Sequence, residues 1–108
     1  MDSRLRFTTA FEEDVHNALL YIETVLASPQ AAQKLMKAID KEILRIATQP
    51  FICAISAKPY LKEHEYRECF VNHYVIIYRL HGEEIVFLRL FHQSQHYERF
   101  VMSWSSED

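Results

Sequence analysis

Positively charged and titratable side chains gather in the C-terminal half of this chain, within and after segments rich in β-branched and aromatic residues. The candidates for chemistry are Arg67, Arg79, Arg89, His92, Tyr97 and Glu98. General acid–base catalysis needs one group that accepts a proton, another that donates one, and cations near any negative charge that develops. Histidine titrates near neutral pH and arginine carries a permanent charge, so residues of these types could perform such a reaction.

Each candidate also has a purely structural interpretation. His92 falls on the same side as apolar strand residues, so it could end a core strand and bond a backbone group instead of a substrate. Arg79 is expected to pair with an acidic neighbour. Arg67 and Arg89 are the best candidates for contact with a partner, because a strand holds a cation rigidly.

Three segments predict β-strands, from Tyr66 to Val71, from Asn72 to Leu80 and from Ile85 to Phe91. The only glycine, Gly82, lies between the last two segments and is expected to supply the positive φ of a tight reversal. Strict alternation in the last strand predicts two sets of residues on opposite faces: Val86, Leu88, Leu90 and His92, against Ile85, Phe87, Arg89 and Phe91. We therefore expect one sheet face to cover a helical core and the other to be aromatic, Arg-bearing and open to a partner.

Two amphipathic helices are predicted before these strands, from Thr9 to near Ala27 and from Ser28 to Thr48. The first begins with Thr9-Ala10-Phe11-Glu12, which fits a capping box, and the second with Ser28-Pro29, a favoured start. Both helices carry an apolar stripe, formed by Phe11, Val15, Ala18, Leu19, Ile22 and Leu26 and by Ala32, Leu35, Ile39, Ile43 and Ile46. The short joint between them predicts an antiparallel helical hairpin.

A basic stripe runs beside the apolar face of the second helix and comprises Lys34, Lys37, Lys41 and Arg45. A solvated helix face is the simpler interpretation, and a contact strip for phosphates or an acidic partner is the functional one. Residues 51–65 are predicted to be a loop that carries Lys58 and Lys62. Leu5-Arg6-Phe7 is expected to be a short edge or joining strand.

Length and element order predict the fold class. A chain of 108 residues forms one domain, residues 1–108, with a single core. Helices that precede strands indicate an α+β fold, in which an N-terminal helical hairpin packs on one face of a small, mainly antiparallel sheet. The expected order is β-α-α-β-β-β with a short C-terminal helix.

Composition narrows the function. The formal net charge of −3 argues against tight sequence-independent binding of nucleic acid, and no apolar run reaches transmembrane length. The N-terminus lacks the apolar segment of a signal peptide, so we expect a cytoplasmic protein. Cys53 and Cys69 form no metal-binding pattern, and reduced thiols are favoured over a disulfide there. We assign no cofactor and no metal.

Four segments carry a family resemblance, and the family's order is kept across most of the chain. They are A-F-E-E-D-V…Y-I from Ala10 to Ile22, S-P-Q-A-A-Q-K-L from Ser28 to Leu35, Y-R-E-C-F-V-N-H-Y-V-I-I-Y-R-L from Tyr66 to Leu80, and I-V-F-L-R-L-F-H-Q-S-Q-H-Y from Ile85 to Tyr97. In these segments the chain resembles the RelE/ParE superfamily, the toxin halves of bacterial type II toxin–antitoxin pairs. The resemblance implies a growth-inhibiting toxin of the kind linked to plasmid stabilization, partnered by a small acidic antitoxin.

The resemblance leaves two activities and an inactive alternative. ParE-like members poison DNA gyrase, and the acidic net charge, the long helical hairpin and the long tail favour this branch. RelE-like members resemble ribosome-dependent mRNA endoribonucleases, for which the matching positions here are Arg67, Arg79, His92 and Tyr97. The third alternative is a catalytically silent co-repressor that binds only antitoxin and DNA. A homodimer and a toxin–antitoxin hetero-oligomer are both consistent with the resemblance. The antitoxin is expected on the exposed face of the sheet or in a groove beside the helical hairpin.

Overall fold

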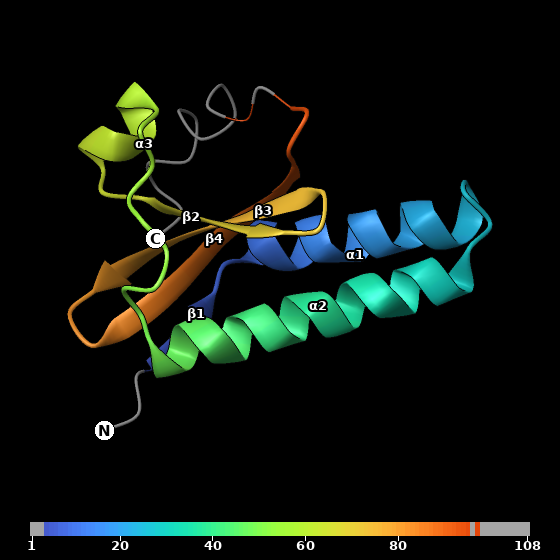
Figure 1. The fold of residues 1–108 in the computed structure, drawn as a ribbon, viewed down its shortest axis with the longest axis horizontal. Coiled ribbons are helices and arrows are strands. Elements are labelled where there is room, and N and C mark those ends of the chain that lie inside the picture. The colour runs from blue at the N-terminus through green and yellow to red at the C-terminus, as the bar shows by residue number, and fades with distance from the viewer. Residues whose placement is uncertain (1–3, 96, 98–108) are drawn as a thin grey trace.

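A computed structural model describes residues 4–95 and residue 97. Its elements are β1 (Arg4–Phe7), α1 (Thr9–Thr24), α2 (Pro29–Thr48), α3 (Pro59–Glu63), β2 (Arg67–Val71), β3 (Tyr74–His81) and β4 (Glu84–His92). The strands form one sheet in the order β1-β4-β3-β2, in which β1 runs parallel to β4 and the other neighbours are antiparallel. The α+β prediction is confirmed (Figure 1). The predicted C-terminal helix falls outside the described residues.

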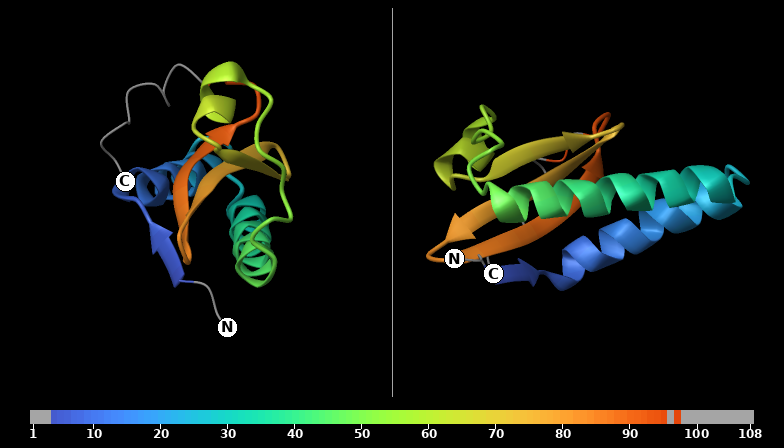
Figure 2. Two further views of the ribbon diagram at one scale, coloured as in Figure 1. Left: turned by 90° about the vertical axis from the view of Figure 1, so that its left-hand side faces the viewer. Right: turned by 60° about the horizontal axis from the view of Figure 1, so that its bottom comes forward.

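The helical hairpin forms as predicted, although one cap and one end differ. The N-cap of α1 is Thr8, whose hydroxyl accepts a hydrogen bond from the Phe11 amide, so the capping box predicted at Thr9 is wrong by one residue. The helix ends at Thr24, three residues before the predicted end, and Ala27 takes a positive φ of 51° in the joint. Ser28 caps α2 as predicted. Figure 2 shows α1 and α2 side by side along one face of the sheet.

Two-residue turns connect the three antiparallel strands. Gly82 adopts a φ of 61° between β3 and β4, which confirms the role predicted for it. Asn72 adopts a φ of 53° between β2 and β3, so Asn72 belongs to a turn and not to the predicted strand. Asparagine tolerates this left-handed conformation better than most residues, which explains its place here.

A register shift in β4 overturns the predicted alternation of faces. Ile77 of β3 lies opposite Arg89, whereas the next residue, Tyr78, lies opposite Phe87, so one residue of β4 is left over between them. Such a bulge reverses the side-chain alternation beyond it. Leu90 consequently joins the helix-side core with Phe87, and Phe91 turns to the other face, opposite to the predicted sets.

The sheet is buried on both faces, which corrects the prediction of one core and one open face. The helix-side cluster is centred on Phe11, Ile39, Ile46, Tyr78 and Phe87. The outer cluster contains Leu61, Tyr66, Val75, Ile77, Val86, Leu88, Phe91 and Tyr97. Leu61 comes from α3, which lies within the segment predicted to be a loop, so this short helix helps to cover the outer face. None of the helices in residues 4–95 is long and apolar enough to cross a membrane.

Candidate functional site

The outer face of the sheet holds a compact cluster of three titratable side chains, Lys58, Glu68 and Tyr97, which we call the Glu68 cluster. The Tyr97 hydroxyl donates a short hydrogen bond to Glu68 Oε2, and Lys58 Nζ lies 3.3 Å from the same oxygen. Lys58 Nζ also lies 5.0 Å from the centre of the Tyr97 ring, which itself stacks on Phe91. The cluster therefore places a carboxylate between a phenol and an ammonium group.

Burial and these contacts fix the protonation of two members. Burial and the hydrogen bond to Glu68 raise the pKa of Tyr97, which is only 3% exposed, so the phenol keeps its proton at neutral pH. Burial alone would lower the pKa of Lys58, but the contacts with Tyr97 and Glu68 outweigh it and raise that pKa. Chemically, the cluster offers a proton donor, Tyr97, beside a carboxylate and a fixed cation.

A second group of polar side chains lines a cavity of about 340 Å³, which we call the arginine pocket. Its lining residues are Phe51, His64, Glu65, Arg67, Arg79, Leu80 and Gly82. Arg67 donates a 2.7 Å hydrogen bond from Nη1 to the Cys53 carbonyl, and its guanidinium carbon lies 5.0 Å from the centre of the Phe51 ring. One of the two guanidinium groups in the pocket is thus fixed by the segment between α2 and α3.

His92 lies at the other end of the sheet. Its strand partner is Tyr74, at the start of β3, whereas Arg79 pairs with Val86 near the end of β3. The His92 ring lies against Tyr74, with ring centres 5.2 Å apart, and its Nδ1 is 2.7 Å from the Ser94 hydroxyl. His92 also lines a separate cavity of about 480 Å³ with Asp14 and Tyr21, among others.

The four residues predicted for a nuclease are therefore divided among three places. Arg67 and Arg79 share the arginine pocket, Tyr97 belongs to the Glu68 cluster, and His92 lies at the opposite sheet end. Their catalytic role stays a prediction, since their positions alone do not test it. Glu98 falls outside the described residues. Glu68 was missed by sequence reasoning, although a carboxylate directly before the apolar residues Cys69, Phe70 and Val71 of a predicted strand could have signalled it.

Arg89 occupies a structural position. Its Nε and Nη2 donate hydrogen bonds of 2.5 and 3.0 Å to the two carboxylate oxygens of Asp14 in α1. Asp14 also accepts a 3.0 Å hydrogen bond from the Leu90 amide. β1 pairs with β4 only as far as Phe87, so Asp14 takes over the edge of β4 where β1 has ended. The guanidinium predicted to contact a partner thus holds α1 against the sheet.

The predicted basic contact residues fall into three settings. Lys34, Lys37 and Lys41 lie exposed along α2, and Lys62 is exposed on α3. Arg45 is exposed but is paired with Glu42, with Nη2 and Oε2 2.6 Å apart. Lys58 belongs to the Glu68 cluster. The lysine part of the α2 stripe therefore remains the strongest candidate for contact with an acidic partner.

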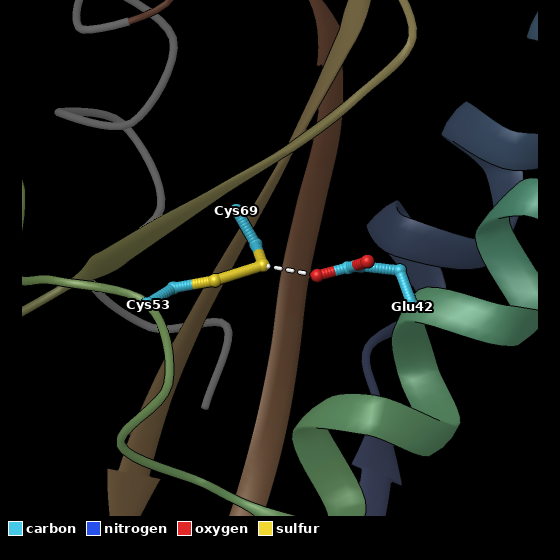
Figure 3. Close-up of side chains that lie close together, drawn as sticks. All are labelled: Glu42, Cys53 and Cys69. Carbon is cyan, nitrogen blue, oxygen red and sulfur yellow. Dashed lines mark hydrogen bonds between the residues drawn. A yellow bond between two sulfur atoms is a disulfide. The ribbon is translucent and has the colours of Figure 1, made fainter.

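Within the described residues, one group has side chains close enough to hold a metal ion: Glu42, Cys53 and Cys69, with ligand atoms within 4.8 Å of one another. In this structure Cys53 and Cys69 form a disulfide, which corrects the expectation of reduced thiols (Figure 3). Metal binding by cysteine requires the thiolate, so the disulfide form offers only the Glu42 carboxylate as a strong ligand. The geometric reason for the bond is that the segment after α2 runs back along β2 and brings the two Cα atoms to 5.5 Å.

Comparisons with known proteins agree with this architecture. The chain is similar to a chain of the chromosomal ParDE toxin–antitoxin system from P. aeruginosa. The two are 19% identical over 83% of this chain and 95% of that chain, with a TM-score of 0.67. It is also similar to the RelBE2 complex from Mycobacterium tuberculosis, with 17% identity over 85% and 99% of the two chains and a TM-score of 0.53. A copper-bound mutant toxin from Helicobacter pylori matches with 20% identity over 85% and 96% and a TM-score of 0.52.

At these identities the solved structures establish the fold alone. No curated protein sequence matches the chain. The sequence profile described as the ParE toxin of the type II toxin–antitoxin system parDE matches residues 5–97. Because this match spans most of the chain, the protein belongs to the ParE toxin family of type II toxin–antitoxin systems.

Proposed function

We propose that this toxin arrests bacterial growth by inhibiting DNA gyrase through protein–protein contact, and that a cognate antitoxin neutralises it. One observation carries the choice of contact over chemistry. The residues that RNA cleavage would draw on lie in three separate places, with His92 at one end of the sheet and Arg79 near the other. A concerted proton transfer needs its acid and base within hydrogen-bonding reach of one substrate, which this separation disfavours.

The antitoxin in this proposal binds the groove beside the helical hairpin. The groove has a volume of about 320 Å³ and is lined mainly by apolar side chains of β1, α1 and α2: Phe7, Phe11, Val15, Met36, Ile39 and Ile43, with Glu12 and Asp40 beside them. An amphipathic antitoxin helix could place its apolar side chains there. Lys37 and Lys41, exposed on α2, would meet acidic side chains that flank that apolar face. The outer face of the sheet, the other expected location, is occupied by its own core cluster.

The target is tested first in growing cells. DNA synthesis and protein synthesis are followed by pulse labelling in one bacterial culture after this chain alone is induced. The gyrase proposal expects DNA synthesis to fall first, and it expects the purified toxin to inhibit supercoiling by purified gyrase. An early fall in protein synthesis with no effect on supercoiling would refute the proposal.

The antitoxin groove is tested by co-expression with the product of the adjacent gene. Met36→Asp places a charge among the apolar lining residues and should abolish co-purification, whereas Gln33→Asp, on the exposed side of α2, should leave it intact. Equal co-purification of both variants would exclude this groove as the binding site. Circular dichroism of each variant checks that the fold is kept.

RNA cleavage remains a second candidate because of the Glu68 cluster. Its phenol, carboxylate and ammonium groups lie within reach of one another, as an acid, a base and a cation would need to. Here Glu68→Gln and Tyr97→Phe should each abolish mRNA cleavage on ribosomes while antitoxin binding persists. If both variants arrest growth as fast as the parent protein, the Glu68 cluster is not a nuclease site.

A further inference from the structure

The group formed by Glu42, Cys53 and Cys69 joins three elements that are distant in sequence. Glu42 comes from α2, Cys53 from the segment that follows α2, and Cys69 from β2 (Figure 3). Glu42 Oε2 lies 2.7 Å from Cys69 Sγ, in the geometry of a hydrogen bond, while Cys69 Sγ is also bonded to Cys53 Sγ. The same sulfur therefore makes two contacts of different chemistry.

These two contacts belong to different redox states. A disulfide sulfur has no hydrogen to donate, and a carboxylate oxygen can only accept, so in the disulfide form two electron-rich atoms face each other. A reduced Cys69 thiol in the same place would donate its S–H to the carboxylate. Glu42 therefore opposes the disulfide and supports the dithiol, and its pairing with Arg45, at 2.6 Å, holds the carboxylate in position.

We propose that Cys53 and Cys69 form a reversible thiol–disulfide switch, which Glu42 biases toward the reduced state. The disulfide fastens residues 49–58, the connection that follows α2, onto β2. Reduction releases that fastening. The device is separate from the gyrase proposal and stands or falls independently of it.

The burial of the two sulfurs determines which one a reductant attacks. Cys53 is half-buried, whereas Cys69 is 1% exposed, so a dithiol reductant reaches the Cys53 sulfur. Its thiolate attacks Cys53 Sγ, the S–S bond breaks, and the electron pair leaves on Cys69 Sγ, which takes up a proton. The second thiol of the reductant then attacks the mixed disulfide and releases Cys53. Two electrons and two protons pass from the reductant to the cysteine pair.

The rest of the connection keeps reduction local. The Ser56 amide donates to the Tyr66 carbonyl at 2.9 Å, and the Glu68 amide donates to the Ala54 carbonyl at 3.3 Å. These bonds do not involve sulfur and should hold residues 54–56 beside β2 after reduction. Tyr78 and Arg67 also donate hydrogen bonds to the Pro50 and Cys53 carbonyls. The effect should therefore fall between these two anchors, on residues 51–53, and so on Phe51, whose 73% exposed ring borders the arginine pocket.

The first test is a redox titration of the full chain in mixtures of reduced and oxidised dithiothreitol, with EDTA present so that metal ions cannot compete. Free thiols are trapped by alkylation and counted by mass spectrometry. The comparison is between the parent protein, Glu42→Gln, and the control Asp40→Asn, which removes an exposed carboxylate from the same helix.

Glu42→Gln should need about a tenfold higher ratio of reduced to oxidised dithiothreitol at the midpoint, equivalent to about 30 mV for a two-electron couple. Asp40→Asn should titrate with the parent protein. Coincident midpoints for the parent protein and Glu42→Gln would overturn the role of Glu42. Two free thiols in the fully oxidised buffer would overturn the switch itself.

The second test asks whether reduction acts locally. Hydrogen exchange should become faster at the amides of residues 51–53 on reduction, while the amides of β3 and β4 keep their protection. Cys53→Ser with Cys69→Ser should reproduce the reduced pattern in every buffer. Unchanged exchange at residues 51–53, or loss of protection throughout the sheet, would each contradict a local switch.

Discussion

Substitution of Asp14 by alanine should destabilise the protein by much more than its position on a surface helix suggests. The carboxylate accepts three hydrogen bonds, two from Arg89 and one from the Leu90 amide. The Asp14 and Arg89 side chains are only 15% and 19% exposed. Removing the carboxylate therefore leaves a cation and a backbone amide with less compensation at the edge of β4.

The magnitude follows from the number and kind of bonds. A hydrogen bond to a charged group contributes about 1.5–3 kcal/mol when well shielded, and partial exposure of this pair reduces that value. We therefore expect Asp14→Ala to lower the free energy of unfolding by about 3 kcal/mol. Asp14→Asn keeps an acceptor oxygen for the Leu90 amide and should lose about half as much.

Urea denaturation followed by circular dichroism measures these differences. The neighbouring exposed residue gives the control, because Glu13→Ala should stay within about 0.5 kcal/mol of the parent protein. A double-mutant cycle of Asp14→Ala with Arg89→Ala should show a coupling energy of about 1 kcal/mol or more. A coupling near zero, or a loss below about 0.5 kcal/mol for Asp14→Ala, would refute the structural role given to Arg89.

Three further changes probe the other parts of the fold. Tyr97→Phe should lower the free energy of unfolding by about 1–2 kcal/mol, because Glu68 loses a hydrogen bond. Burial and that bond raise the pKa of Tyr97 above its ordinary 10.0. The stabilisation linked to the Tyr97 proton is therefore complete below about pH 10 and is lost as the pH rises further. Tyr97→Phe should reduce this loss in denaturation curves measured from about pH 8 to 11. A methyl group at Gly82 would meet no atom within 4 Å, so Gly82→Ala should lower the free energy of unfolding only by the strain of the positive φ, about 1–2 kcal/mol by urea denaturation. A larger loss would contradict the open space around this turn. Ile46 is fully buried, so Ile46→Ala leaves a cavity in its place and should lower the free energy of unfolding by about 2–5 kcal/mol in the same assay. Leu44→Ala, at an exposed position of the same helix, should lower it by less than about 1 kcal/mol.

The helical hairpin could be predicted from sequence because its determinants are local. Apolar residues at helical spacing, and a serine followed by a proline, act within a few residues of one another. The misplaced cap shows the limit of this reasoning. Thr8 and Thr9 are equally good candidates, but only Thr8 can also donate its hydroxyl to the Leu88 carbonyl, a contact 80 residues away.

The strands were predictable and their faces were not. Alternation assigns faces correctly only while the ladder is regular, and the bulge between the Ile77 and Tyr78 pairings reverses every side chain beyond it. The outer face was wrongly predicted to be open because the residues that cover it come from outside the strands. Phe91, turned outward, stacks on Tyr97 in the cluster that also contains Leu61 of α3. This helix has only five residues, too few for sequence periodicity to reveal it.

The candidate site was harder to predict because residue type does not reveal partners. Arg89 had the features of a contact residue, yet its partner is Asp14, 75 positions earlier in the chain. Glu68 attracted no attention, yet it joins Lys58 and Tyr97. Both relations depend on which elements the sheet brings together, and neither leaves a local pattern in the sequence.

The distribution of buried charge also bears on how this toxin could act. Arg89 holds α1 against the sheet, Arg67 holds the connection that follows α2, and Lys58 holds Glu68. Cationic side chains that are already bonded within the protein are poorly placed to bind a phosphate, because each would have to break its existing hydrogen bond or ion pair. The helical hairpin, in contrast, has an exposed surface in which the apolar groove lies near lysines of α2. A surface of this kind recognises a protein better than a nucleic acid, so mutations that abolish toxicity without destabilising the fold should gather on the hairpin and not among the strand arginines.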